Sequence, residues 1–143
     1  MMRKALIVGI NDYSFGPLKG CIADANKMFN ILSRDFDDTP NFSCKKLISS
    51  EVTIDIPELK QSVIDLFATD SEVALFYFSG HGSEPTPISN PCLVTQDAKT
   101  HNEGMELSFL MDMANKSKVG EIVIILDCCF SGAAGNGHFG MPM

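Results

Sequence analysis

Residues 73–82 read Val-Ala-Leu-Phe-Tyr-Phe-Ser-Gly-His-Gly, an apolar run that ends in a histidine between two glycines. The run is apolar at every position over residues 73–78, which is typical of a strand buried on both faces of a parallel sheet. Glycine adds nothing to a hydrophobic core, so the two flanking glycines favour an imidazole that is open to a ligand over a histidine that only occupies a turn. The stretch therefore predicts a buried strand with a functional residue at its carboxyl end.

Further strands and helices are expected on both sides of this stretch. Three other apolar runs predict strands at residues 5–10, 44–48 and 122–126. Apolar residues that recur at spacings of three and four predict helices over residues 18–35, 56–66 and 105–116. Asp55 is the candidate N-cap of the second helix, and a proline-rich loop followed by a short extended segment at 92–95 is expected after His81. Strands that alternate with helices predict a mostly parallel α/β sheet flanked by helices on both faces.

The composition bounds the class of protein. The 143 residues carry 18 acidic and 11 basic side chains, a formal charge of −7, and 45% of them are hydrophobic, which suits one globular domain. The acidic balance argues against a nucleic-acid partner, because such proteins neutralise many phosphates. No apolar run approaches the roughly 20 residues that span a membrane. Five cysteines without metal-ligand or disulfide spacing indicate a reducing, cytoplasmic compartment.

Candidate catalytic residues lie at the carboxyl ends of the predicted strands, where open parallel sheets bind their ligands. Cys129 follows the strand at 122–126, and 129 − 81 gives 48 residues from His81 to Cys129. This order and spacing are typical of the His/Cys pair of caspase-type proteases. Side chains alternate along a strand, so Asp127 and Cys129 are expected on one face and Cys128 on the other, in the core.

Taken together, the motifs resemble those of caspase-like cysteine peptidases of the metacaspase and bacterial orthocaspase branch. The resemblance covers the whole chain, as the large-subunit part of that catalytic domain, and rests on residues 4–11, 18–25, 76–82 and 127–132. It implies a three-layer sandwich that lacks its small-subunit strands, with a catalytic domain over 1–143 in which 132–143 is a loop or a processed end. The family pattern Asp-Ser-Cys-His-Ser-Gly is changed here, since Cys128 replaces the serine and Phe130 the second histidine.

The resemblance also implies roles for individual residues. His81 matches the catalytic histidine and Cys129 the nucleophile, while the backbone N–H groups of Gly82 and Cys129 match the oxyanion hole. No third residue that orients the imidazole is evident from the sequence. The acidic pocket for the residue before the cleaved bond matches Cys21, Asp24, Ser79 and Asp127.

Two carboxylates in such a pocket suit an Arg or Lys side chain and repel Asp, so the expected substrate is a protein or peptide cut after a basic residue. Each of the two acids also fits a purely structural role. Asp24 fits as a charge that complements a helix dipole, and Asp127 as the cap of a loop.

Calcium and a partner chain are the remaining expectations from the resemblance. Many metacaspases use a cluster of aspartates for calcium, and Asp97 lies where one ligand falls. The paired acids are reduced to Met105-Glu106, and Asn136 replaces another acid, so neither a high-affinity calcium site nor another cofactor is expected. The chain ends 143 − 129 = 14 residues after Cys129, which predicts the large fragment of a self-processing zymogen in a signalling, cell-death or defence pathway, paired with a small-subunit chain.

Two other functions are compatible with parts of the sequence. One is a caspase-like module that has lost catalysis and serves as a binding or scaffold protein, which the retention of both His81 and Cys129 disfavours. The other is a nucleotide-binding doubly wound domain. No Gly-x-Gly-x-x-Gly or Gly-Lys-Ser/Thr loop follows the first predicted strand, which disfavours nucleotide binding.

Overall fold

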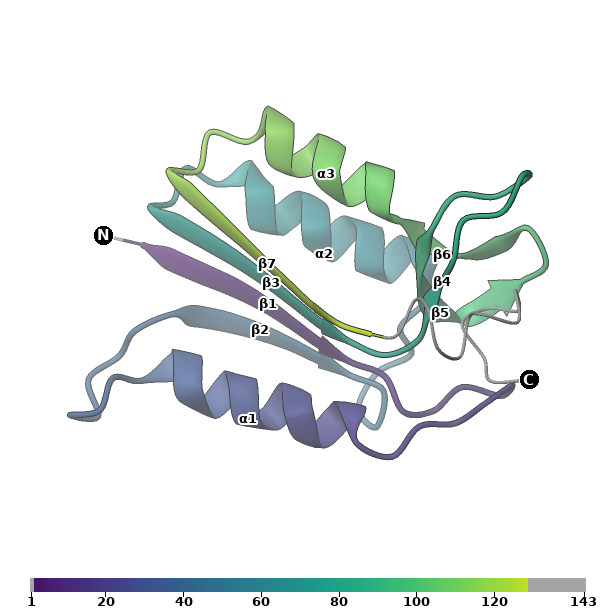
Figure 1. Ribbon diagram of the computed structural model, residues 1–143. Helices are drawn as coiled ribbons and strands as arrows, with labels where there is room; N and C mark the ends of the chain where they lie inside the picture. The colour runs from purple at the N-terminus through teal and green to yellow at the C-terminus, as the bar shows by residue number, and fades with distance from the viewer. Residues whose placement is uncertain (1, 129–143) are drawn as a thin grey trace.

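A four-stranded parallel sheet lies between helices in the computed structural model, which describes residues 2–128 (Figure 1). In spatial order its strands are β2 (Ser43–Ile48), β1 (Arg3–Gly9), β3 (Val73–Ser79) and β7 (Glu121–Asp127). One face is covered by α1 (Cys21–Ser33), and the other by α2 (Ile56–Ala68) and α3 (Leu107–Lys116). The predicted mostly parallel α/β sheet with helices on both faces is confirmed.

A second, antiparallel sheet lies at the carboxyl ends of the main strands (Figure 1). It consists of β4 (Gly82–Ser83), β5 (Cys92–Lys99) and β6 (Asn102–Glu106). The predicted helix at 105–116 therefore begins two residues late, because Met105 pairs with Leu93 in the sheet instead of starting the helix. Close backbone packing fixes this hairpin, since a Cβ on Gly104 would meet the carbonyl of Leu93. None of the helices in residues 2–128 is long and apolar enough to cross a bilayer.

Alternation along the strands divides the core into two layers. Side chains of one parity, such as Leu6 and Phe76, pack toward α2 and α3, whereas the other parity, such as Ile7 and Tyr77, packs toward α1. Cys128 packs against the layer beneath α2 and α3, as its predicted parity requires. Burial of the two layers supplies the main favourable free energy of the fold.

The first turn of α1 is fixed directly to the end of β1. Gly20 at its N-cap offers no side chain, and the side-chain oxygen of Asn11 instead accepts hydrogen bonds from the backbone N–H groups of Cys21 (2.9 Å) and Ile22 (3.2 Å). A Cβ on Gly9 would lie 2.6 Å from the carbonyl oxygen of Cys21, so helix and strand approach each other closely. This contact places the start of α1 beside the carboxyl ends of the strands.

Two carboxylates accept hydrogen bonds from the backbone N–H groups of the first turn of α2. Asp55 accepts a hydrogen bond from the N–H of Glu58 at 2.9 Å, which confirms it as the N-cap. Asp97 of β5 accepts from the N–H of Ile56 at 3.1 Å and from the hydroxyl of Thr95 at 2.6 Å. Asp97 therefore links the antiparallel sheet to α2.

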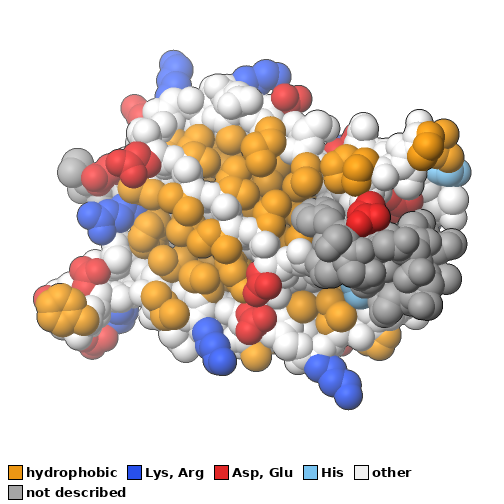
Figure 2. Space-filling model, viewed as in Figure 1, with side chains coloured by type: hydrophobic (Ala, Val, Ile, Leu, Met, Phe, Trp, Pro, Cys, Tyr) orange, Lys and Arg blue, Asp and Glu red, His pale blue; other side chains and the backbone are white. Residues whose placement is uncertain are grey.

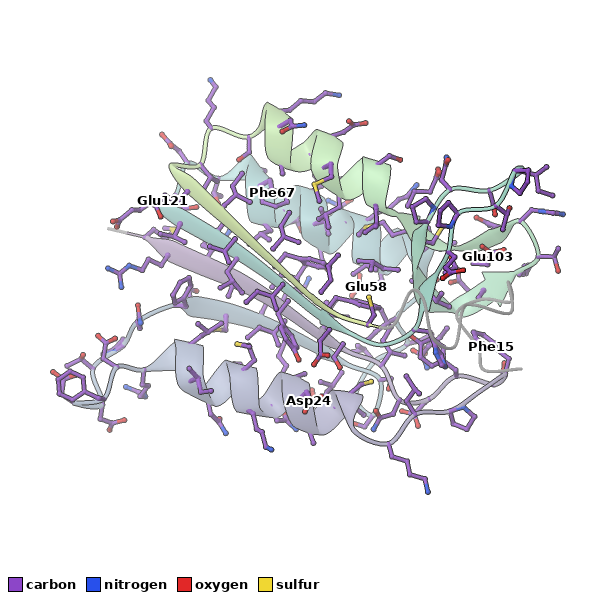
Figure 3. The ribbon with its side chains drawn as sticks, viewed as in Figure 1. Phe15, Asp24, Glu58, Phe67, Glu103 and Glu121 are labelled. Carbon is purple, nitrogen blue, oxygen red and sulfur yellow. The ribbon has the colours of Figure 1, made fainter. Side chains whose placement is uncertain are left out.

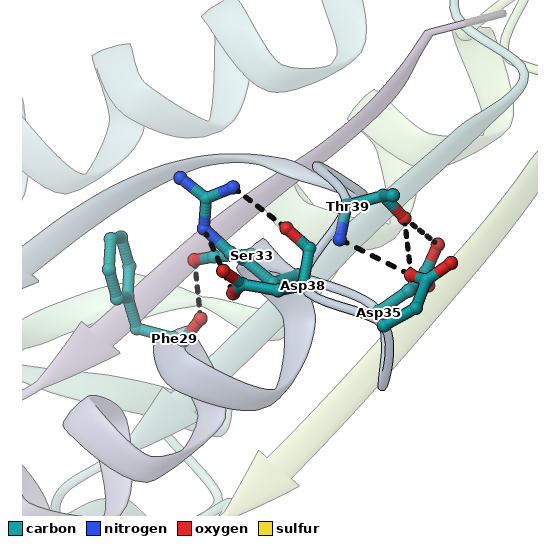
Figure 4. Close-up of polar contacts among 7 residues, drawn as sticks. Phe29, Ser33, Asp35, Asp38 and Thr39 are labelled. Atoms are coloured by element: carbon teal, nitrogen blue, oxygen red, sulfur yellow. Dashed lines mark hydrogen bonds and ion pairs between the residues drawn. The ribbon is translucent and has the colours of Figure 1, made fainter.

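The connection from α1 to β2 lies at the opposite end of the sheet and is held by its own polar side chains (Figure 4). The hydroxyl of Thr39 donates to Asp37 at 2.7 Å and to Asp35 at 3.2 Å, and Arg34 pairs with Asp38 at 3.8 Å. The aspartates of this loop thus bond within the loop, at the end of the sheet far from the carboxyl ends of the strands (Figure 1).

Candidate active site

His81 lies in the short connection between β3 and β4, and its main chain is held on both sides. Its backbone N–H donates to the hydroxyl of Tyr13 at 3.1 Å, and its carbonyl accepts from the N–H of Val94 at 2.9 Å. The Tyr13 hydroxyl in turn donates to the carbonyl of Val94 at 2.8 Å. Burial raises the pKa of Tyr13 well above its usual range, so Tyr13 keeps this proton. Tyr13 and β5 together fix the connection that carries the imidazole.

The His81 ring is held in one orientation and one tautomer. Its Nε2 lies 2.6 Å from the backbone carbonyl oxygen of Gly16, and a carbonyl only accepts hydrogen bonds, so Nε2 carries the proton. The other ring nitrogen, Nδ1, then presents a lone pair and can act as a base. The ring of Tyr13 packs at 4.6 Å between centroids, and that of Phe15, labelled in Figure 3, at 6.3 Å.

The orienting group that the sequence did not reveal is thus a backbone carbonyl. Gly16 has a φ of 147°, in the region that favours glycine, and this conformation belongs to the loop that brings its carbonyl to His81. A backbone group leaves no side-chain signature in the sequence. A glycine at position 16 is the one sequence signal that is compatible with such a conformation.

The four residues predicted for an acidic pocket lie together on the α1 face of the sheet. Cys21 and Asp24 come from the first turn of α1, where Figure 3 labels Asp24, while Ser79 ends β3 and Asp127 ends β7. The sheet register places Ser79 directly beside Asp127. Tyr77, which the sequence analysis did not single out, joins them because its hydroxyl donates to Oδ2 of Asp127 at 3.0 Å.

The acidic cluster formed by these residues combines two carboxylates with neutral donors. Burial raises the pKa of the Cys21 thiol, the negative charges of Asp24 and Asp127 raise it further, and a hydrogen bond with Ser79 only partly opposes this. Within residues 2–128 the one ion pair joins Arg34 to Asp38, so no cationic side chain there compensates Asp24 or Asp127. The electrostatic field of the cluster favours a cation.

Part of the predicted machinery lies outside the described residues. Gly82 is placed in β4, paired with Leu93, directly after His81. Cys129, with its own N–H, lies outside residues 2–128, as do Phe130, Asn136 and the predicted loop at 132–143.

The carboxylate of Asp97, the candidate calcium ligand, accepts hydrogen bonds within the protein. Both of its oxygens accept from the N–H of Ile56, and Oδ1 also accepts from Thr95. Calcium prefers six or more oxygen ligands, mostly charged for useful affinity. In the part of the chain that the structure describes, no three His, Cys, Asp or Glu side chains gather as a metal site.

The outer edge of β7 and the sheet face beside it are uncovered in the described structure. Among residues 2–128, β7 pairs with β3 alone. Figure 2 shows apolar side chains gathered between α1 and α3, and Val123 and Ile125 of β7 are 38% and 37% exposed. An apolar edge strand of this kind favours pairing with another chain or segment.

Comparisons with known proteins agree on the fold. The family model described as the caspase domain matches residues 2–141. A crystal structure of a protein from Geobacter sulfurreducens superimposes with a TM-score of 0.70 at 17% sequence identity, covering 90% of this chain. The present chain spans about half of that protein, 51% of its length, and the likeness concerns the fold. No protein of curated function matches the chain.

Proposed function

Because the chain belongs to the caspase domain family, we propose that it is a cysteine endopeptidase that uses His81 and Cys129 to cut peptide bonds after Arg or Lys. The observation that carries this proposal is the held imidazole of His81. Its Nε2–H donates to the carbonyl oxygen of Gly16, which leaves Nδ1 as the base. The pair fits the spacing of 48 residues in the sequence.

The reaction follows from these two groups. Nδ1 of His81 takes the proton of the Cys129 thiol, and the thiolate attacks the carbonyl carbon of the peptide bond. The protonated imidazole then gives that proton to the departing amine, which leaves an acyl-enzyme. Water, deprotonated by the same imidazole, releases the acid and restores the thiol. The N–H groups of Gly82 and Cys129 are proposed to stabilise the oxyanion, an effect commonly worth about 3 kcal/mol per donor.

The acidic cluster supports the proposed preference for basic residues. Asp24 and Asp127 carry negative charge beside Cys21 and Ser79, and no described cation neutralises them. An Arg or Lys side chain before the cleaved bond would compensate both charges, whereas Asp would be repelled. This charge pattern supports the metacaspase and orthocaspase type of enzyme over an Asp-cutting caspase.

A second polypeptide segment is the partner that we propose, in addition to the protein substrate. The unpaired edge of β7 and its exposed Val123 and Ile125 support the addition of small-subunit strands to the sheet. The described chain then acts as the large-subunit portion of one catalytic domain, in a self-processed zymogen of a signalling, cell-death or defence pathway.

We further propose that catalysis needs no calcium and takes place in the reducing environment of the cytoplasm. The Asp97 carboxylate accepts hydrogen bonds from the Ile56 N–H and the Thr95 hydroxyl, which supports catalysis without calcium. Cys21, Cys44 and Cys92 are free thiols rather than disulfides, which supports a reducing environment.

The test is cleavage of two fluorogenic peptides that differ only in ending on Arg or on Asp, using the full-length protein together with its Cys129→Ala and His81→Ala variants. Cleavage after Arg that vanishes in both variants is expected. The Cys44→Ala variant, which lacks another partly exposed thiol, is the matched control and should keep full activity. Cleavage that survives loss of Cys129, or that prefers Asp, contradicts the proposal. A folded protein that cleaves neither peptide favours the scaffold alternative.

A further inference from the structure

Tyr77 is a buried residue that contacts the acidic cluster, and the sequence motifs assign no role to it. It lies on β3 with its side chain 4% exposed, among the apolar residues that pack toward α1. Its hydroxyl reaches across to β7 and donates to Oδ2 of Asp127 at 3.0 Å. A buried hydroxyl must be hydrogen-bonded to be tolerated, and Asp127 provides that partner.

The neighbouring positions of β3 show that the ring alone does not require a tyrosine. Phe76 and Phe78, on either side of Tyr77, are fully buried without any hydroxyl, on the face toward α2 and α3. Phenylalanine is thus the aromatic residue that this strand uses for packing. The hydroxyl at position 77 is explained by its bond to the carboxylate of Asp127.

Tyr77 remains a donor wherever the protein is folded near neutral pH. Burial raises the pKa of Tyr77 to about 12, and the hydrogen bond and charge of Asp127 add to this effect. Tyr77 therefore occupies the Oδ2 atom of Asp127, while the Oδ1 atom accepts no hydrogen bond from residues 2–128. Asp24, whose charge also acts on Tyr77, supplies a second carboxylate from the side of α1.

We propose that Tyr77 determines specificity: by binding Oδ2 of Asp127 it fixes that carboxylate in one orientation, so that the pocket prefers Arg over Lys. This inference rests on the proposed function and refines its substrate. A planar guanidinium presents its donors in a fixed geometry and gains from acceptors that do not move. A lysine ammonium is a point charge on a flexible stem and binds equally well to a carboxylate that follows it.

The experiment compares kcat/KM for two peptides that differ only in ending on Arg or Lys, using the full-length protein and its Tyr77→Phe variant. Phenylalanine keeps the ring and removes the hydroxyl. The ratio of Arg to Lys kcat/KM should fall by about tenfold, which corresponds to about 1.4 kcal/mol. The fall should come from a higher KM for the Arg peptide, with kcat unchanged.

A purely structural role for Tyr77 would weaken both peptides equally. The Leu75→Val variant is the matched control, because Leu75 lies on the same strand and the same face but carries no polar group. It should leave the Arg to Lys ratio unchanged. An unchanged ratio in Tyr77→Phe as well would overturn the inference.

Binding to the Cys129→Ala protein separates this inference from the proposed catalysis. The probes are the N-acetylated amides of arginine and lysine, and their Kd values are measured by NMR titration. Tighter binding of the arginine amide that is lost in the Cys129→Ala/Tyr77→Phe protein supports the inference even if the wild-type protein cleaves no peptide. Equal binding of the two amides, or binding of neither, overturns it.

Discussion

The hydroxyl oxygen of Tyr13 lies 2.6 Å from the point where a Cβ on Gly80 would stand, so Tyr13 and a side chain at position 80 exclude each other. The same hydroxyl binds the N–H of His81 and the carbonyl of Val94. The glycine before the histidine is therefore explained by the space that Tyr13 needs. The sequence suggested an imidazole that is open to a ligand, whereas His81 is only 5% exposed in the structure.

Replacement of Gly80 by alanine should damage both stability and catalysis. The added Cβ also meets the ring of Phe78 at 2.9 Å, and overpacking of this kind costs about 1–3 kcal/mol of unfolding free energy. We expect kcat to fall as well, because His81 moves with the connection. Urea denaturation and peptide cleavage check both effects. Gly20→Ala is the control, since nothing lies within 4 Å of its Cβ, and a Gly80→Ala protein as stable and active as this control would refute the contact.

Asn11 should influence substrate binding through the start of α1. Asn11→Ala removes the acceptor of the Cys21 and Ile22 N–H groups and should lower the unfolding free energy by about 1 kcal/mol. KM for the Arg peptide should rise, because that turn carries Asp24. Asn11→Asp keeps an acceptor and should restore both quantities. A loss of stability without any change in KM would show that the turn does not position the pocket.

Asp24→Ala should cost activity on Arg peptides far more than it costs folding. Removing one of two carboxylates halves the charge available to the substrate, and we expect kcat/KM to fall about tenfold or more, in line with the roughly 1.5–3 kcal/mol of a charged hydrogen bond. Thermal unfolding of the same variant measures the cost to the fold. Unchanged turnover in a folded variant would remove Asp24 from the pocket.

Asp97→Ala should destabilise the protein to the same extent with and without calcium. The variant leaves the Ile56 N–H and the Thr95 hydroxyl without their acceptor, which costs about 1–2 kcal/mol. Thermal unfolding is measured in excess calcium and in excess chelator, for the wild-type and variant proteins. A loss seen only in calcium would assign Asp97 to a metal site.

Alkaline conditions should destabilise the wild-type protein more than its Tyr77→Phe variant. Because the pKa of Tyr77 is raised to about 12 in the folded state, its contribution is complete below the unfolded value of about 10 and is lost as pH rises through 12. The stability difference should shift by about 1–2 kcal/mol in favour of the variant across that interval. Denaturant titrations at pH 8 to 12 measure it, and parallel curves for the two proteins would show that Tyr77 ionises equally in both states.

The sequence predicts what depends on side-chain pattern. The parity of a strand was enough to place Cys128 against the core. The resemblance to a family, rather than any pattern in the chain, named Cys21, Ser79 and Asp127, which the fold brings together. The orienting group of His81 escaped prediction because it is a carbonyl on Gly16. Tyr77 escaped because a tyrosine within an apolar run has the pattern of a core residue.

The antiparallel hairpin shows a different limit of the sequence. The predicted helix starts at Met105 and carries its apolar side at Leu107, Leu110, Met111 and Ala114, yet Met105 lies in β6 and pairs with Leu93 of β5. Apolar spacing alone does not say at which residue a helix begins. The close approach of Gly104 to the Leu93 carbonyl, a contact between distant segments, decides the boundary.

The parallel pairing of β3 with β7 also bears on when the acidic cluster forms during folding. Ser79 meets Asp127 across a long crossover that contains the β5–β6 hairpin and α3, as a parallel pair requires. Pairings between distant segments form slowly, because the entropy of closing the loop is lost before the contacts form. A chain still emerging from the ribosome carries His81 but not yet β7, so Asp127 joins the acidic cluster only once that strand has been made.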